Sequence, residues 1–174
     1  HFGSISLVRE PGASTFEGLM EREHGRRVVC LDPNVRPGLI ADRDAYVRRL
    51  EHWVRLADLV KVSRADLAWL YPDLAPETAA DRWLALGPAL VVVTLGADGA
   101  MGVTAGGVRA VAGGHRITVA DTVGAGDAFS AIFLLGRSCG WPLGQTLARA
   151  NEFAGAICAI PGAVPRDMDF YDKW

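Results

Sequence analysis

Apolar and polar positions along the chain alternate in the pattern of buried strands connected by amphipathic helices. Residues 90–95 (LVVVTL) form a continuous β-branched run, which is typical of a parallel strand buried on both faces. Residues 43–57 carry apolar side chains at helical spacing and predict an amphipathic helix. Shorter apolar runs predict strands at 5–8, 28–31, 59–62 and 117–119, and a hairpin at 101–104 and 108–112. Further helices are expected at 12–24, 64–70, 77–86, 127–139 and 143–160.

This order of elements predicts an α/β fold built on a mainly parallel sheet. A length of 174 residues suits one hydrophobic core, so we expect a single α/β domain over residues 1–174. Ligands bind beyond the carboxyl ends of the strands in such sheets. Function is therefore expected just after Leu31, Val62, Leu95 and Val119, where polar or glycine-rich segments follow.

Composition and charge exclude several classes of protein. Eighteen basic and twenty acidic side chains leave a net charge of −2, so a nucleic-acid partner is not expected. No apolar run approaches the roughly 18–20 residues that cross a bilayer, and no export signal is recognisable. Cys30, Cys139 and Cys158 are far apart, which favours buried thiols in a reducing cytoplasm over a zinc site or a disulfide framework. Because the chain starts at His1 and enters an apolar run at once, we expect a fragment.

Residues 121–127 (DTVGAGD) form a glycine-rich turn between an expected strand and an expected helix. Small residues let the backbone approach a ligand, and the unpaired N–H groups of a first helical turn attract anions. Asp127 has two interpretations. It could cap the helix, or it could act as a general base on a substrate hydroxyl while the turn amides hold a phosphoryl group. The turn alone supports both equally.

Other motifs for phosphate binding and catalysis are absent from the sequence. No Gly-Lys dipeptide occurs, which excludes the lysine-based phosphate loop, and no GxGxxG, HExxH or GxSxG pattern occurs. The turn at 124–127 is the remaining phosphate-binding candidate.

Four segments in register resemble the PfkB/ribokinase family of carbohydrate kinases. DTVGAGDAFSAIFL resembles the family's C-terminal signature, and LDPNVRP resembles the DPNxR segment of its fructokinase-like and keto-deoxygluconate-kinase-like members. LVVVTLGADGA resembles its TLGxxG strand and turn, and ARANEFAGAICAIPGAVP resembles its late helix and following loop. The resemblance implies a three-layer α/β/α ribokinase-like fold, of which this chain is the C-terminal nucleotide-binding part. The resemblance also implies that the N-terminal half, with the lid and much of the sugar pocket, is missing from this chain.

The resemblance implies roles for the turn residues. Asp127 matches the catalytic base that activates the sugar hydroxyl, and it also contacts the substrate. Gly124, Ala125 and Gly126 match the anion hole for the transferred phosphoryl group, a reaction in which positioning and charge stabilisation do most of the catalysis. Asp121 matches a carboxylate that some members place near a monovalent cation such as K⁺. A strand-end turn residue is its alternative interpretation.

The resemblance also implies a nucleotide site. Thr94, Gly96 and Gly99 match the nucleotide-binding turn, although a tight turn after a buried strand requires glycine in any case. Asn151 matches an asparagine beside the adenine, and an exposed helix residue is the alternative.

The segment at 61–66 stands where the family has its NxxE motif, but here it reads SxxD. We expect Lys61, one of two lysines, and Ser63 near the nucleotide, and Asp66 to order Mg²⁺-bound water. Because aspartate is one methylene shorter than glutamate, a capping pair of Ser63 and Asp66 is an equal alternative.

Asn34 and Arg36 resemble residues that approach the substrate or the transferred phosphate. A planar guanidinium suits anionic oxygens, and a turn with a solvated arginine is the alternative.

Together these features predict a cytoplasmic, ATP-dependent, Mg²⁺-assisted sugar kinase. The DPNVR segment favours fructose or a 2-keto-3-deoxy acid over ribose or a nucleoside. A homodimer of the full-length protein is left open. The alternatives are a nucleotide-binding fragment or inactive homologue without turnover and, less favoured, a structural protein with an inherited fold.

Overall fold

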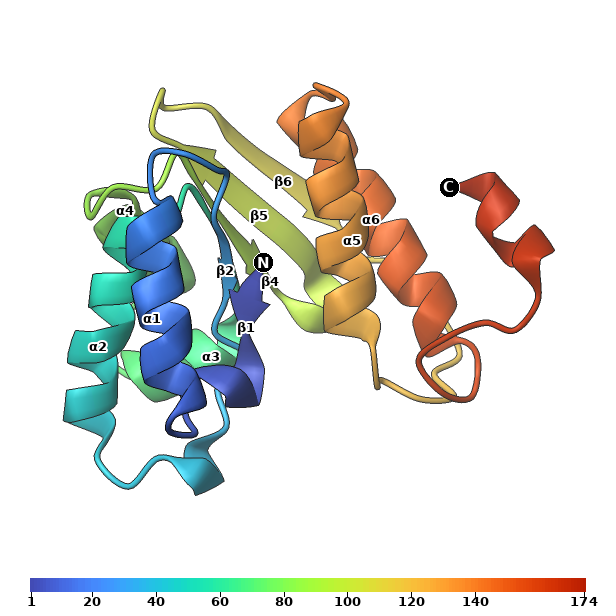
Figure 1. The fold of residues 1–174 in the computed structure, drawn as a ribbon. Helices are drawn as coiled ribbons and strands as arrows, with labels where there is room; N and C mark the ends of the chain where they lie inside the picture. The colour runs from blue at the N-terminus through green and yellow to red at the C-terminus, as the bar shows by residue number, and fades with distance from the viewer. The chain divides into compact units, whose positions relative to one another are not determined.

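A computed structural model describes residues 1–174, in which strands and helices alternate along the chain (Figure 1). The strands are β1 (Phe2–Gly3), β2 (Cys30–Asp32), β3 (Leu59–Ser63), β4 (Leu90–Thr94), β5 (Gly99–Thr104) and β6 (Arg109–Gly113). The α-helices are α1 (Gly12–Glu23), α2 (Arg43–Leu56), α3 (Arg64–Leu70), α4 (Pro76–Leu84), α5 (Ala125–Ser138) and α6 (Leu143–Cys158). Short 3₁₀ helices are η1 (Ser4–Leu7), η2 (Pro37–Leu39), η3 (Gly96–Asp98) and η4 (Met168–Lys173). The six strands form one sheet in the order β1 to β6, and β1 to β4 are parallel, which confirms the predicted fold class.

The chain divides into two compact units. Unit 1 contains His1–Thr94 and Gly102–Arg109, and unit 2 contains Leu95–Met101 and Ala110–Trp174. No helix in either unit combines the length and hydrophobicity that a membrane-spanning segment requires.

Unit 1 is organised around the parallel strands β1 to β4. The register of β3 on β4 runs from Leu59 beside Leu90 to Ser63 beside Thr94, so the carboxyl ends of these two strands coincide. Trp53 of α2 and Trp83 of α4 are fully buried in the core. Burying a large apolar side chain stabilises the fold by roughly 3 kcal/mol, and each indole N–H retains a hydrogen bond, so both helices are firmly anchored.

Unit 2 is built on the packing of α5 against α6, which lie side by side (Figure 1). A Cβ at Gly136 of α5 would lie 2.7 Å from Cγ2 of Thr146 and 2.8 Å from the Trp141 ring, so only glycine allows this close approach. Phe129 and Phe133 stack on the buried face of α5 with ring centroids 6.5 Å apart. The helix pair thereby fixes the position of the α5 N-terminus within the unit.

The predicted strand at 5–8 is wrong, because Ser4–Leu7 form η1 and the strand is Phe2–Gly3. The Ser6 hydroxyl donates to the carbonyl of Gly3 at 2.6 Å, and the Val8 amide donates to Ile5. These local hydrogen bonds replace the ladder that a strand needs.

The predicted strand at 117–119 is also wrong, because these residues have no regular structure. Ile117 and Val119 are exposed, and the next amides, those of Ala120 and Asp121, donate to the carbonyl of Cys158 at the end of α6. The segment before the glycine-rich turn is therefore held by a helix terminus rather than by a strand neighbour. The other predicted elements are present with ends that differ by up to two residues.

Candidate functional site

The glycine-rich turn at 121–127 leads directly into α5 in unit 2. Gly124 is the N-cap of α5 in the left-handed region, with φ 81° and ψ −8°. A Cβ there would lie 2.6 Å from Cβ of Ala163, so both the backbone and the packing require glycine. The Ala125 amide donates to the Thr122 carbonyl at 3.3 Å, whereas the amides of Gly126 and Asp127 make no hydrogen bond within the chain. The start of α5 therefore presents open N–H donors, as an anion site requires.

Asp127 lies in the first turn of α5 and is exposed. The N-cap is Gly124, and no side chain caps this helix, so the capping interpretation of Asp127 is wrong. The Asp127 carboxylate makes no hydrogen bond or ion pair with another residue. A carboxylate in this position is free to accept a proton from a ligand beside the open amides.

Asp121 connects the turn to the loop after α6. Its Oδ1 accepts the Val123 amide at 3.0 Å, and its Oδ2 accepts the Gly162 amide at 3.3 Å. Burial and, to a lesser extent, the negative charge of Asp121 raise the pKa of the Cys158 thiol. Both carboxylate oxygens of Asp121 thus already order the backbone around the turn.

Three of the residues predicted to bind nucleotide come together in unit 2. Gly96 and Gly99 have positive φ values of 67° and 101°, and they bound the turn of η3. A Cβ at Gly99 would lie 2.1 Å from the carbonyl oxygen of Ala112. Asn151 of α6 donates through Nδ2 to the carbonyls of Ala112 at 3.0 Å and Gly113 at 3.3 Å. The glycine turn and Asn151 therefore meet at the end of β6, and Asn151 is a half-buried residue of α6 rather than the exposed helix residue of the alternative interpretation.

Thr94 and Ser63 are the last residues of neighbouring strands in unit 1 and are paired in the sheet. Ser63 caps α3, because its Oγ accepts the Asp66 amide at 3.0 Å while Asp66 Oδ2 accepts the Ser63 amide at 3.1 Å. This is the predicted capping pair.

Asp66 makes a further contact that the sequence does not predict. Its Oδ1 accepts the amide of Val35 at 2.9 Å, a buried hydrogen bond between α3 and the segment after β2. Asp66 is 9% exposed, and both of its oxygens accept hydrogen bonds.

Lys61 lies in the middle of β3 and is 4% exposed. Its Nζ is 2.8 Å from Oδ2 of Asp32, which is 3% exposed, in a buried ion pair. Lys61 therefore binds the DPNVR segment rather than presenting its charge at the surface.

Asn34 and Arg36 are the more accessible residues of that segment. Asn34 is half-buried and has φ 41°, a left-handed conformation that few residues other than glycine adopt. The exposed Arg36 folds back so that its Nη1 donates to Asn34 Oδ1 at 2.5 Å and to the Asn34 carbonyl at 2.9 Å. The two predicted substrate residues thus lie side by side.

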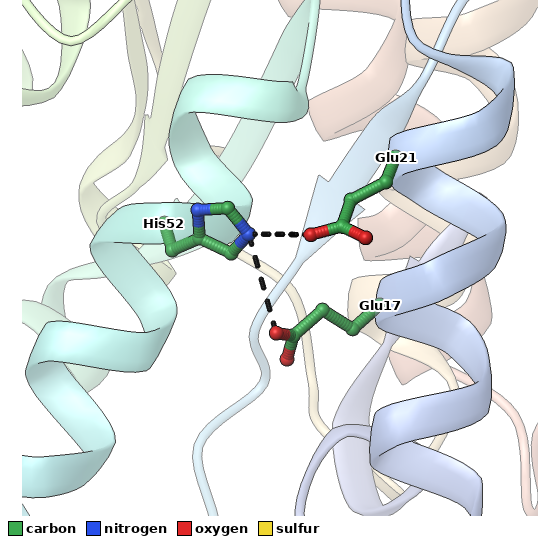
Figure 2. Close-up of side chains that lie close together, drawn as sticks. All are labelled: Glu17, Glu21 and His52. Atoms are coloured by element: carbon green, nitrogen blue, oxygen red, sulfur yellow. Dashed lines mark hydrogen bonds and ion pairs between the residues drawn. The ribbon is translucent and has the colours of Figure 1, made fainter.

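One side-chain cluster was missed from the sequence. Figure 2 shows Glu17 and Glu21 of α1 facing His52 of α2, whose Nε2 lies 3.1 Å from Glu21 and 4.0 Å from Glu17. Glu17 also accepts hydrogen bonds from Arg49 at 2.7 Å and Trp53 at 2.9 Å. The positive guanidinium competes with a cation, so we interpret the cluster as an interhelical polar network. Its only sequence signal is the helical spacing of the two glutamates.

Comparison with known proteins places the chain in a family. The family model described as pfkB family carbohydrate kinase matches residues 7–168. A fructokinase from Rhizobium leguminosarum bv. trifolii is 44% identical over 131 residues, which cover 75% of this chain and 40% of the relative. A 2-dehydro-3-deoxygluconokinase from Bacillus subtilis (strain 168) is 31% identical, over 94% of this chain and 49% of the relative. The chain spans about half the length of the curated relatives it matches.

The solved structures that are similar to this chain also include kinases. Aminoimidazole riboside kinase from Salmonella enterica, complexed with aminoimidazole riboside and an ATP analogue, superposes with a TM-score of 0.79 at 30% identity. That match covers 93% of this chain and 56% of the other. Fructokinase from Vibrio cholerae O395, with fructose, ADP and calcium ion bound, superposes with a TM-score of 0.78 at 28% identity, over 94% of this chain and 55% of the other.

Proposed function

The chain belongs to the pfkB family of carbohydrate kinases, and from this membership we propose that it is the C-terminal nucleotide-binding and catalytic part of an ATP-dependent sugar kinase. The observation that carries the proposal is the start of α5, where an exposed carboxylate with no partner adjoins open backbone amides. Packing alone does not require an acid at that position.

In the proposed reaction Asp127 acts as the general base. Its carboxylate takes the proton from a sugar hydroxyl as that oxygen forms a bond to the γ-phosphorus of ATP, and the bond from this phosphorus to the β–γ bridging oxygen breaks. The proposed anion hole is the turn at Gly124, Ala125 and Gly126, where the open Gly126 amide stabilises the negative charge on the transferred phosphoryl group. The products are a sugar phosphate and ADP.

We propose that Thr94, Gly96, Gly99 and Asn151 line the nucleotide site. The meeting of the glycine turn with Asn151 at the end of β6 supports this assignment for three of them. Ser63 is proposed near the nucleotide because it ends β3 beside Thr94. Relatives of this chain have been solved with ADP or with an ATP analogue.

Mg²⁺ fits this chain as an ion held mainly by ATP phosphates and water, where it neutralises phosphate charge. The carboxylates predicted near metal ions, Asp66 and Asp121, each have both oxygens engaged with N–H or O–H donors. Carboxylates engaged in this way do not form an all-protein cage for the ion. A monovalent cation such as K⁺ is proposed to lie near the carboxylate of Asp121.

The proposed acceptor is fructose or a 2-keto-3-deoxy sugar acid, recognised in part by Asn34 and Arg36. The names of the relatives support this class, and a riboside kinase among the matches makes riboside the alternative acceptor. The cytoplasmic location and the homodimer of the full-length protein stay predictions, the second testable by sedimentation of the native protein.

The test begins with the intact mass of the native protein, followed by ATP-dependent phosphorylation of fructose, 2-keto-3-deoxygluconate and aminoimidazole riboside. Turnover on one of these acceptors supports the proposal. ATP binding without turnover on any of them contradicts it and favours a nucleotide-binding protein. That alternative is raised by the half-length match to the relatives.

A further inference from the structure

Asp66 links two motif segments that are 31 residues apart in the sequence. One oxygen accepts the Ser63 amide and hydroxyl at the start of α3, and the other accepts the amide of Val35. Val35 stands between Asn34 and Arg36, the two residues proposed to meet the sugar. A single carboxylate thus fixes the centre of the segment that presents them.

The segment at 32–36 is held by contacts on both sides of Asn34. Asn34 has φ 41°, in the left-handed region, which asparagine adopts more readily than most residues other than glycine. The Pro33 carbonyl accepts the Ser4 amide at 3.1 Å, and Asp32 pairs with Lys61. The hydrogen bond from the Val35 amide to Asp66 comes directly after Asn34 in the chain. It therefore holds the segment on the C-terminal side of Asn34.

We propose that Asp66 is a positioning residue for the sugar, which holds Asn34 and Arg36 in place through the amide of Val35. This inference rests on the proposed kinase function. It assigns Asp66 to positioning of the sugar-binding segment in place of ordering Mg²⁺-bound water. A hydrogen bond from a buried amide to a carboxylate is among the stronger ones in proteins, and small displacements of a binding group reduce catalysis strongly. Loss of Asp66 therefore weakens sugar binding, whereas the response to Mg²⁺ stays the same.

The chain offers a matched control at the opposite ends of the same two strands. The Val29 amide, just before β2, donates to Oδ2 of Asp58, just before β3, at 2.7 Å. The two contacts are of the same kind, each joining a carboxylate to an amide about thirty residues away. Only the Asp66 contact lies at the DPNVR segment.

The first measurement is amide hydrogen exchange in wild type, Asp66→Ala and Asp58→Ala. We expect the exchange of the Val35 amide to accelerate by about tenfold to a hundredfold in Asp66→Ala, with Val29 unchanged, and the converse in Asp58→Ala. Unchanged exchange at Val35 in a folded Asp66→Ala variant overturns the proposal without reference to any activity.

The second measurement separates positioning from metal binding. With the acceptor that the wild type phosphorylates, Asp66→Ala is expected to raise the sugar KM about tenfold while the half-activating Mg²⁺ concentration stays the same. Asp58→Ala leaves that KM unchanged. A shifted Mg²⁺ response with unchanged sugar KM overturns the proposal in favour of a metal role.

Asp66→Asn provides a variant that removes the charge and keeps an oxygen to accept the Val35 amide. Its amide nitrogen then faces the Ser63 amide and cannot accept a hydrogen bond from it, so partial rescue, with Val35 protection and sugar KM between those of wild type and Asp66→Ala, is the expected result. Failure of the proposed function is distinct from failure of this inference, because it appears as absence of turnover in the wild type, whatever the exchange data are.

Discussion

The buried charged residues at the motifs of unit 1 and the carboxylate of Asp127 in unit 2 differ in how far the protein itself satisfies them. In unit 1, Asp32, Lys61 and Asp66 are each at most 9% exposed, and the hydrogen bonds of Lys61 and Asp66 run to other motif residues. In unit 2, the Asp127 carboxylate is exposed and has no partner, and the backbone amides of Gly126 and Asp127 are open. The buried charged side chains of unit 1 are thus satisfied within the protein, whereas Asp127 of unit 2 is open to a ligand.

This difference indicates that charged side chains stabilise the fold in unit 1 and are available to react with a ligand in unit 2. Buried polar groups are tolerated only when they are paired. Mutation of one partner is therefore expected to lower the stability of the fold and to displace the segment that the pair holds. An exposed carboxylate without a partner contributes little to folding and retains its full capacity to react. Mutation of the buried charges of unit 1 is therefore expected to reduce stability, and mutation of Asp127 is expected to reduce activity.

The largest expected effect is on catalysis at Asp127. Asp127→Asn removes the proposed base without disturbing a contact, so turnover on the accepted sugar is expected to fall by about 10²–10⁴-fold, with the free energy of unfolding unchanged. Steady-state kinetics and urea unfolding measure the two quantities. Asp44→Asn, at another exposed first-turn carboxylate, serves as control and leaves both unchanged. Retention of wild-type turnover in Asp127→Asn contradicts the assignment of the base.

The next effect is on the stability of unit 1. Lys61→Met removes the ammonium group that lies 2.8 Å from the buried Asp32 carboxylate and is expected to lower the free energy of unfolding by about 3–5 kcal/mol. The double variant Lys61→Met with Asp32→Leu removes both charges and recovers much of that loss, because apolar pairs often replace buried ion pairs at little cost. Chemical unfolding of the three proteins checks this. Equal stability of Lys61→Met and wild type is inconsistent with the buried pair.

A smaller effect is expected at the turn of unit 2. Gly124→Ala forces a left-handed conformation on alanine and places Cβ against Ala163, which is expected to cost about 1–3 kcal/mol. Gly140 has a similar φ of 71° with open space around it, so Gly140→Ala reports the backbone cost alone. A larger loss for Gly124→Ala than for Gly140→Ala in thermal unfolding measures the packing of the turn on the loop after α6. Equal losses contradict that packing.

Much of the fold could be predicted from local pattern. The run at 90–95 is uniformly apolar and β-branched, and it forms a strand over Leu90–Thr94. The helix at 64–70 has its predicted bounds, because Ser63 and Asp66 carry the capping signal within four residues of sequence. The predicted strand at 5–8 failed because a serine hydroxyl bonds the preceding backbone, a local competition that apolar spacing does not reveal.

The same distinction between local and long-range contacts applies to the candidate site. The glycine turn and Asp127 are contiguous in sequence, so their arrangement at a helix start could be anticipated. The bond from Val35 to Asp66 joins residues 31 apart and depends on how β2, β3 and α3 pack, which no local pattern specifies. The burial of Lys61 likewise depends on its strand lying between two others.

The smallest expected effect concerns the surface of unit 1. Arg49 of α2 binds Glu10 and Glu17, each at 2.7 Å, and its guanidinium lies 5.1 Å from the centre of the Trp53 ring. Arg49 is one-third exposed, so Arg49→Ala is expected to lower the free energy of unfolding by only about 1 kcal/mol at pH 7. This contrasts with the several-fold larger cost expected for Lys61→Met.

The difference in stability between wild type and Arg49→Ala is expected to depend on pH. Burial of the Glu17 carboxyl raises its pKa, but hydrogen bonds from Arg49 and Trp53 outweigh burial and hold the pKa below its ordinary value. A carboxyl with a lowered folded pKa stabilises the protein above its unfolded pKa, about 4.3, and this stabilisation is lost as pH falls through the folded value. The stability gap between wild type and Arg49→Ala should therefore be full at pH 7 and narrow below about pH 4 in urea unfolding. A gap that does not narrow in acid would assign the role of Arg49 to its stacking on Trp53, because that contact does not titrate.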